Sequence, residues 1–317
     1  DWIYRSYMSN SRFPLFFEKI QQDPELAECL VCDDLHAVQR NISQFDCSME
    51  AVFKAPNRRA LIRFVKLANA DRIPLYPFSK GANWAFGSRV PTGNNCVAVD
   101  LSSLNQITGY DPVVGSVRVE PGVTQGDLCE FLKTQQSAYF FDVTGSGRST
   151  SVLGNSLERG IAYNSLRVNR VSQLEVLLPS GEILQTGFLS RGVFDVGKAY
   201  PFGVGPSLDQ IFFQSNYGIV LSAIYQLHPC PQAQIPVQVR FNESQLSQVI
   251  ETYRWLQQQG VLDCIVHSAD PFRSVSTLSP LLSPSVAASW SQRVIKNQEW
   301  SSILSVSGSS ELVKAKP

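Results

Sequence analysis

The sequence lacks several features that would point directly to a class of partner. It has no excess of one charge, because 27 Lys and Arg residues balance 27 Asp and Glu residues. A balanced chain gives no electrostatic argument for nucleic acid or an anionic membrane as its main partner. No apolar run approaches the roughly 20 residues that a membrane-spanning helix needs, and there is no internal repeat. We therefore expect a soluble, folded protein with no nucleic-acid partner and no membrane span.

Cysteine is also scarce. The 7 cysteines are scattered and odd in number, which is not the pattern of a disulfide framework in a chain of 317 residues. Cys29 and Cys32 form one C-x-x-C pair, but no second pair or histidine follows at zinc spacing, so we interpret them as ordinary cysteines. Reduced thiols favour a cytoplasmic location. Because the sequence begins at Asp1 and not at a methionine, removal of a targeting segment remains an alternative.

The chain is long enough for two domains, and its apolar pattern contains both helices and strands. Leu61, Phe64, Val65 and Ala68 recur at helical spacing, and Asn57 is a suitable N-cap for that helix. The runs IPLYPF and CVAVDL predict strands on either side of a glycine-bearing turn. A further strand, VRVEPGV, precedes a helix predicted from its N-cap Thr124.

The rest of the chain continues this mixture. QLEVLLP and EILQTG predict a hairpin around Ser180–Gly181, and GIVLSAIYQLHP predicts a buried strand that ends at Pro229. After this point PVQVRF, LDCIVH and ILSV predict strands, one helix ends at Gly260, and another begins near Ser285. Helices and strands without strict alternation indicate the α+β fold class. The predicted parts are an N-terminal extension (1–47), a larger domain (48–231, divided near residue 106) and a smaller domain (232–317).

The turn Ser79–Gly87 is the first candidate for chemistry. It lacks the glycine spacing of a nucleotide triphosphatase and that of a Rossmann fold. Its small residues would nevertheless allow successive backbone N–H groups to converge on an anion such as a pyrophosphate. Considered alone, a glycine turn between strands is more often a structural connection.

Six ordered segments change that interpretation. They read PFSKGANWAFGS, VAVDLSSLNQI, VRVEPGVTQGDL, GSGRSTSVLGNSLERGIAYN, LEVLLPSGEIL and GPSLDQIFFQSNYGIVLSAIYQLHP. In this order they resemble the flavin-binding domain of the vanillyl-alcohol oxidase and p-cresol methylhydroxylase family, from about residue 50 to residue 231. The resemblance implies a two-subdomain FAD-binding fold followed by an α+β cap domain, which is incomplete here because relatives continue further.

The resemblance also implies where the cofactor binds. The turn after the predicted strand IPLYPF would hold the pyrophosphate through backbone amides, and the remaining segments would lie along the dinucleotide or the flavin. The implied cofactor-binding residues are Ser79, Lys80, Gly81, Ala82, Asn83, Trp84, Pro121, Gly122, Gly145, Ser146, Ser149, Gly154, Asn155, Gly218, Ile219 and Val220. For Gly81, Gly122, Gly154 and Gly218, close approach of the cofactor is favoured over simple turn geometry.

Catalytic and substrate-binding residues follow from the same resemblance. Relatives place an acidic residue near flavin N5, which would be Glu158 here, with Arg159 and Tyr163 as further catalytic candidates; a local ion pair between Glu158 and Arg159 is an equally weighted alternative. Phe86 lies in the substrate pocket where phenol-oxidising members have a tyrosine, and a phenyl ring cannot stabilise a phenolate. Simple para-hydroxybenzyl substrates are therefore expected to be poor.

The predicted function is that of an FAD-dependent oxidoreductase, an oxidase or a dehydrogenase, which transfers a hydride from a small organic substrate to flavin N5. Oxygen or an electron-transfer protein would be the acceptor. Covalent flavin attachment in such folds uses His, Tyr or Cys, and the pyrophosphate turn has none, so we expect non-covalent FAD. The alternative is a flavin-binding subunit that needs a partner chain, with a second chain completing the cap. The three histidines are interpreted as structural or solvent-facing, namely His36, His228 and His267.

Overall fold

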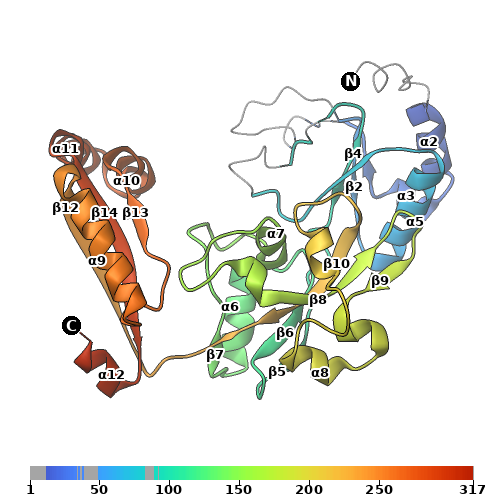
Figure 1. Cartoon of the computed structure of the whole chain (residues 1–317). Coiled ribbons are helices and arrows are strands. Elements are labelled where there is room, and N and C mark those ends of the chain that lie inside the picture. Colours follow the sequence, from blue (N-terminus) through green and yellow to red (C-terminus); the bar gives the residue numbers. More distant parts are fainter. Residues whose placement is uncertain are drawn as a thin grey trace. The chain divides into compact units, whose positions relative to one another are not determined.

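The computed structural model of the chain describes residues 12–33, 35, 38, 49–82, 89–91 and 93–316. Its residues divide into two compact units (Figure 1). The first unit consists of Asp1–Phe141, Gly145–Gly160 and Leu166–His228, and the second consists of Asp142–Thr144, Ile161–Ser165 and Pro229–Pro317. The predicted mixture of helices and sheets is confirmed.

The first unit begins with a four-stranded sheet in the order β1-β2-β4-β3. Its strands are β1 (Leu30–Val31), β2 (Ala51–Lys54), β3 (Leu75–Phe78) and β4 (Val97–Asp100), and β4 is parallel to both of its neighbours. The predicted helix α5 (Arg58–Ala70) connects β2 to β3, and the Asn57 side chain accepts a hydrogen bond from the amide of Ala60. Its apolar face packs on the sheet, where Phe64 stacks on Phe53 with ring centroids 3.8 Å apart. Two helices pack beside α5, namely α2 (Arg12–Gln21) and α3 (Pro24–Ala27).

An antiparallel five-stranded sheet follows in the order β5-β6-β10-β8-β9. Its strands are β5 (Ile107–Asp111), β6 (Ser116–Val119), β8 (Val171–Leu177), β9 (Ile183–Gln185) and β10 (Ile219–Gln226). The predicted hairpin is confirmed, since β8 pairs with β9 across a turn in which Gly181 has φ +83°. Two helices bury their apolar residues with this sheet: α6 (Gln125–Thr134), which Thr124 caps as predicted, and α7 (Val152–Leu157).

Short elements complete the first unit. They are β7 (Tyr139–Phe140), which pairs with β11 (His228–Pro229), the helix α8 (Phe194–Ala199), and the 3₁₀ turns η1 (Arg167–Arg170), η2 (Gly187–Arg191) and η3 (Asp209–Phe212).

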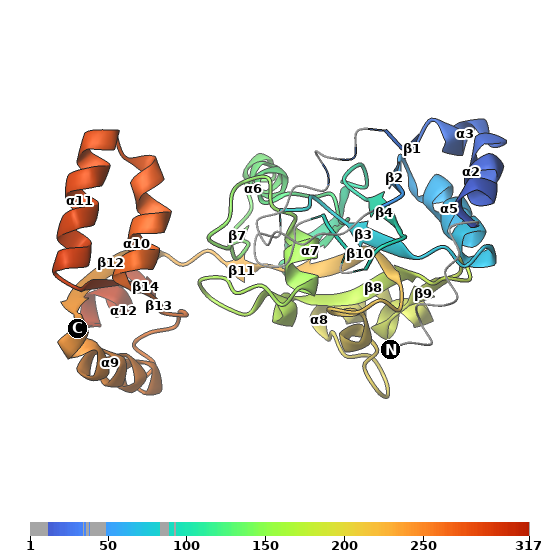
Figure 2. The ribbon, with the colours of Figure 1, turned by 90° about the horizontal axis from the view of Figure 1, so that it is seen from above.

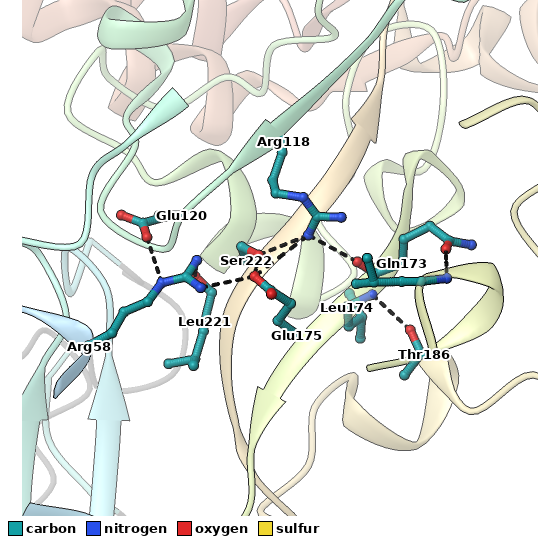
Figure 3. A network of polar contacts seen from close by, with 10 residues as sticks. Arg58, Arg118, Glu120, Gln173, Leu174, Glu175, Thr186, Leu221 and Ser222 are labelled. Carbon is teal, nitrogen blue, oxygen red and sulfur yellow. Dashed lines mark hydrogen bonds and ion pairs between the residues drawn. The ribbon is translucent and has the colours of Figure 1, made fainter. Parts of the chain in front are cut away.

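A charged network links helix α5 to the five-stranded sheet (Figure 3). Arg58, in the first turn of α5, donates from Nε to Glu120 over 2.9 Å and from Nη1 to Glu175 over 3.0 Å. Arg118 and Ser222 extend the network, since Arg118 Nη1 donates to Ser222 Oγ over 2.9 Å and Ser222 donates to Glu175. Burial by itself would raise the pKa of Glu175, but the Ser222 hydrogen bond and the neighbouring guanidinium groups together lower it.

The second unit contains a three-stranded antiparallel sheet in the order β12-β14-β13. Its strands are β12 (Ala233–Asn242), β13 (His267–Ala269) and β14 (Glu299–Gly308). Figure 2 shows α9 (Leu246–Gln258) on one side of this sheet and α10 (Pro271–Leu278) and α11 (Pro284–Lys296) on the other. The remaining elements are α12 (Ser310–Ala315) and the 3₁₀ turns η4 (Glu243–Gln245) and η5 (Ser279–Leu281).

Two features of the second unit differ from the sequence prediction. The predicted strand LDCIVH is wrong for all but its last residue, because β13 starts at His267. Leu262 and Cys264 are instead buried beneath α9 without joining the ladder, and Cys264 exchanges hydrogen bonds with the backbone of Ser305. Helix α10 was not predicted, although Asp270 caps it and Pro271 occupies its first turn. No helix in the described part of the chain is long and apolar enough to cross a membrane.

Candidate functional site

The turn after β3 is held by basic side chains. Gly81 has φ +62°, and a methyl group built on it would lie 2.1 Å from Arg89 Cγ, so only glycine fits beneath the Arg89 side chain. Arg89 donates to the carbonyl of Lys80 over 3.4 Å, and its guanidinium lies 5.8 Å from the centre of the Phe78 ring. Lys80 Nζ donates to the carbonyl of Ser102 over 3.3 Å. Neither cation pairs with a carboxylate in the described part of the chain, so this turn suits an anion.

The same turn lies against α7. A methyl group built on Gly154 would lie 2.3 Å from Ser79 Oγ, so the two predicted cofactor-binding segments are in contact. Ser151, which caps α7, accepts a hydrogen bond from the amide of Gly154 over 2.9 Å and donates to the carbonyl of Pro121 over 2.6 Å. The structure therefore brings together three segments that are far apart in the sequence.

Gly122 is fixed by backbone packing. Its amide donates to the carbonyl of Leu104 over 2.6 Å, and a methyl group on it would lie 2.3 Å from the carbonyl oxygen of Ser102. That oxygen is also the one that Lys80 contacts. The protein itself thus provides a sufficient reason for glycine at position 122, whatever the cofactor does.

The loop that contains Gly145, Ser146 and Ser149 is partly open to solvent. Gly145 and Ser149 are exposed, and Ser146 is half-buried. The buried side-chain amide of Gln125 donates to the carbonyls of Ser146 and Gly147 over 3.2 Å each. A buried side chain of α6 therefore fixes the backbone of this loop.

Gly218, Ile219 and Val220 lead into β10. A methyl group on Gly218 would lie 2.6 Å from Val176 Cγ1, so a larger residue would disturb β8. Ile219 and Val220 are buried and pair with β8, whereas β6 pairs only with Ala223–Gln226. On the β6 side, the backbone of residues 219 and 220 therefore lies beyond the paired part of β10.

Glu158 and Arg159 form the end of α7. Both are exposed, and they form no ion pair with each other in the described structure. Arg159 has φ +55°, a left-handed conformation that ends the helix and in which glycine is usually found. The two side chains therefore remain open to solvent at the end of the helix that carries Gly154 and Asn155.

Tyr163 belongs to the second unit, whereas Glu158 belongs to the first. The carbonyl of Tyr163 accepts a hydrogen bond from the amide of Ile265 over 2.7 Å, and its ring lies 4.7 Å from that of His267. The buried Asp142 carboxylate orders the same loop by accepting hydrogen bonds from Asn164 and Ser165. His267 Nε2 is buried without a hydrogen-bond partner in the described part of the chain.

Some predicted residues cannot be placed, and others were missed. Ala82 is exposed at the end of the turn, whereas Asn83, Trp84 and Phe86 lie outside the described residues. Sequence reasoning missed Arg89, Ser151, Gln125 and Arg167. Arg89 follows closely after the glycine turn, and its charge was an available signal. Ser151 precedes a helix as an N-cap serine, which was also an available signal. Gln125 and Arg167 contact the site only through tertiary packing, which no local pattern reveals.

A dinucleotide fits the observed geometry. Gly81 and Gly154 have no room for a side chain, because Arg89 and Ser79 occupy the space beside them. Lys80 and Arg89, which pair with no carboxylate among the described residues, suit phosphate charge. Residues 49–187 match the family described as FAD binding domain. A solved structure of p-cresol methylhydroxylase with substrate bound superposes with a TM-score of 0.88 at 22% identity, covering 98% of this chain and 63% of that one.

Residues 49–187 form an FAD-binding domain, and the fold of the chain is that of p-cresol methylhydroxylase. FAD is the cofactor of this domain type, and the resemblance seen in the sequence is confirmed. A 4-ethylphenol oxidase from Gulosibacter chungangensis has the same fold, with a TM-score of 0.85 at 21% identity, covering 98% of this chain and 62% of that one.

Curated relatives of the FAD-binding domain are oxidoreductases and a decarboxylase. A 1'-carboxy-chondrochloren decarboxylase from Chondromyces crocatus is 35% identical over 67% of this chain and 40% of its own length. A 4-cresol dehydrogenase (hydroxylating) flavoprotein subunit from Pseudomonas putida is 28% identical over 62% of this chain and 39% of its own length. The chain thus spans about two fifths of the length of these relatives, which belong to an FAD-linked enzyme family.

Proposed function

We propose that the chain is the FAD-binding part of an oxidoreductase that removes a hydride from a small organic substrate. The observation that carries the proposal is the contact between the turn Ser79–Gly81, the segment Pro121–Gly122 and α7, which matches the expected binding path of FAD. The bound flavin would supply the redox chemistry by accepting the hydride at N5. We infer non-covalent binding, because the predicted pyrophosphate turn contains no His, Tyr or Cys.

The chain's own residues would bind, orient and move protons. Backbone amides around Gly81 would hold the phosphates, with Lys80 and Arg89 adding charge. Glu158 would accept a substrate proton, provided that its carboxylate comes within hydrogen-bond reach of the reacting group. Its exposure and its lack of an ion pair with Arg159 in the described structure favour this role over the local ion pair. Tyr163 is proposed as a further polar group for the substrate.

An absorption spectrum before and after acid precipitation tests the proposal. Purified protein incubated with excess FAD should show flavin absorbance after the free cofactor is removed, and precipitation should leave a yellow supernatant. Protein that retains no flavin would contradict the proposal as a whole. A yellow pellet containing a flavin-bearing peptide would contradict only the non-covalent part.

Substrate class is a separate question. Reduction of the flavin by 4-hydroxybenzyl alcohol, followed by stopped-flow absorbance, should be slow because Phe86 offers no partner to a phenolate. Rapid bleaching at low substrate concentration would show that another residue stabilises the anion. Because one relative is named a decarboxylase, carboxylated compounds form the second class to test, with release of carbon dioxide as the measurement.

A second candidate is a flavin-binding subunit that acts only with a partner chain. It is favoured by the relative that is named a flavoprotein subunit. In that case electrons would leave through an electron-transfer protein and not to oxygen. Oxygen consumption by the chain alone, compared with reduction of an artificial electron acceptor, distinguishes the two candidates.

A further inference from the structure

Arg167 is a fully buried cation with no carboxylate partner in the described part of the chain. It opens the turn η1, and its relative exposure is 0%. Nη1 donates to Asn155 Oδ1 over 3.1 Å and lies 3.5 Å from Gln125 Oε1, and the guanidinium lies 5.8 Å from the centre of the Tyr225 ring. Nε and Nη2 have no hydrogen-bond partner there.

Such an arrangement is unfavourable for folding alone. A buried charge requires compensation by an opposite charge or by a complete set of hydrogen bonds, and Arg167 has neither. Apolar residues of similar volume often replace buried charges without loss of stability. The tyrosine ring compensates only in part, because a desolvated cation–π contact is worth on the order of 2 kcal/mol, whereas burial of an ion costs several kcal/mol. Stability therefore gives no reason for arginine at this position.

The contacts of Arg167 lead to both walls of the proposed flavin site. Asn155 belongs to α7, and Gln125 holds the carbonyls of Ser146 and Gly147. The backbone reinforces the first connection, since Arg167 donates to the carbonyl of Gly160, and Gly160 donates to that of Asn155, over 3.0 and 2.9 Å. One side chain thus joins α7 to the loop after β7.

Gly160 makes the contact with Asn155 possible. A methyl group built on Gly160 would lie 2.0 Å from Asn155 Oδ1, the atom that accepts the Arg167 hydrogen bond. Any larger residue at position 160 would push the amide away. The glycine of the ERG sequence is therefore explained by the Arg167–Asn155 pair and not by turn geometry.

We propose that Arg167 is a positioning residue of the flavin site and that its uncompensated charge raises the reduction potential of the bound flavin. This inference rests on the proposed function. The guanidinium would fix Asn155 and Gln125, and through Gln125 the backbone of the adjoining loop. A buried positive charge would also favour the reduced flavin, which carries more negative charge than the oxidised form.

Three variants separate the two effects. Arg167→Met removes both charge and hydrogen bonds, Arg167→Lys keeps the charge, and Arg191→Met removes an exposed charge as the matched control. FAD affinity is measured by fluorescence quenching, and the reduction potential by equilibration with a reference dye. At an effective dielectric constant of about 20, two unit charges about 10 Å apart interact strongly enough to change the equilibrium constant for a step that creates one of them roughly tenfold.

The expected results differ among the variants. Arg167→Met should lower the equilibrium constant for flavin reduction about tenfold, which is about 30 mV for a two-electron couple. Arg167→Lys should keep the potential but weaken FAD binding roughly fivefold, because an ammonium group cannot reproduce the planar donor geometry. Arg191→Met should change neither quantity.

The contrary results are equally distinct. A wild-type potential in Arg167→Met would overturn the electrostatic effect, and wild-type FAD affinity in Arg167→Lys would overturn the positioning effect. If thermal unfolding shows that Arg167→Met does not fold, Arg167→Gln removes the charge with a polar side chain and decides the potential. A wild-type chain that binds no FAD would refute the proposed function and this inference together, whereas the other results refute the inference alone.

Discussion

At the scale of single residues, the contact between Gly154 and Ser79 is the sharpest test of the proposed site. Gly154→Ala would bring a methyl group to 2.3 Å from Ser79 Oγ, and we expect it to weaken FAD binding about tenfold, or about 1.4 kcal/mol, because the turn must shift. Helix α7 itself should not suffer, since alanine is a better helix former than glycine. Titration of the apoprotein with FAD gives the affinity.

Two further variants complete this experiment. The double variant Ser79→Ala with Gly154→Ala should recover most of the lost affinity, because the hydroxyl that meets the new methyl group is gone. Gly93→Ala is the control, since a methyl group there has no neighbour within 4 Å. Equal affinities in wild type and Gly154→Ala would show that this contact lies outside the cofactor path.

Glu158 provides a catalytic prediction at the same scale. Glu158→Gln should retain FAD and the fold while slowing flavin reduction by about 10²-fold, the usual contribution of a general base. Rapid-mixing absorbance with a reactive substrate measures this rate, and thermal unfolding confirms that the fold is intact. An unchanged rate would assign Glu158 to the surface of α7 and leave the base to be found elsewhere.

At the scale of secondary-structure elements, the end of α6 is strained. The helix ends at Thr134, and Gln136 adopts a left-handed conformation with φ +49°. Gln136→Gly should raise the free energy of unfolding by about 1 kcal/mol, because glycine adopts this conformation without strain. Gln135→Gly is a matched control that should lower the free energy of unfolding. The backbone of Gln135 is right-handed, and glycine there costs about 0.5–1 kcal/mol. Urea unfolding compares both with wild type, and equal effects of the two changes would contradict the argument.

The elements differ in how far the sequence could predict them. Helices α5 and α6 were predictable because their N-caps Asn57 and Thr124 precede clear apolar periodicity. Strand β13 was misplaced because Leu262 and Cys264 are apolar for packing under α9 and not for a place in the ladder. An apolar run identifies burial but not the partner of the backbone, and only tertiary structure supplies that.

The candidate site shows the same limit. Gly81 and Gly154 could be selected from the sequence, because they stand in segments that resemble the flavin-binding domain of a known family. Arg167 could not be selected, since the sequence does not show whether an arginine is buried or exposed. Its role depends on Asn155 and Gln125, which approach it only after α6, α7 and η1 have packed together.

At the scale of the whole molecule, two carboxylates give opposite pH dependences. The pKa of Glu175 is lowered, so its stabilising contribution is present above the unfolded value of about 4.3 and is lost as the pH falls through the folded pKa. Burial raises the pKa of Asp209 despite its hydrogen bond from Thr186. Its contribution is therefore present below the unfolded value of about 3.9 and is lost as the pH rises through the folded pKa.

Conservative variants of Glu175 and Asp209 test the direction in which the stability contribution of each carboxylate changes with pH. Glu175→Gln should be less stable than wild type at neutral pH, and the difference should shrink on acidification below about pH 4. Asp209→Asn should gain stability relative to wild type as the pH rises towards neutrality. Denaturant unfolding across a pH series measures both, and parallel curves for a variant and wild type would contradict the corresponding assignment.

The second unit has a consequence for recombination between homologous genes. It is assembled from three stretches of chain, of which Asp142–Thr144 and Ile161–Ser165 lie within the sequence of the first unit. A chimera spliced only at Pro229 would therefore combine a new β12-β14-β13 sheet with a foreign Tyr163 loop, and the ring contact between Tyr163 and His267 would be lost wherever the new part has no ring at position 267. The eight residues of Asp142–Thr144 and Ile161–Ser165 must be exchanged together with the C-terminal part. Exchange of the second unit between homologues therefore requires three separate segments and not one C-terminal segment.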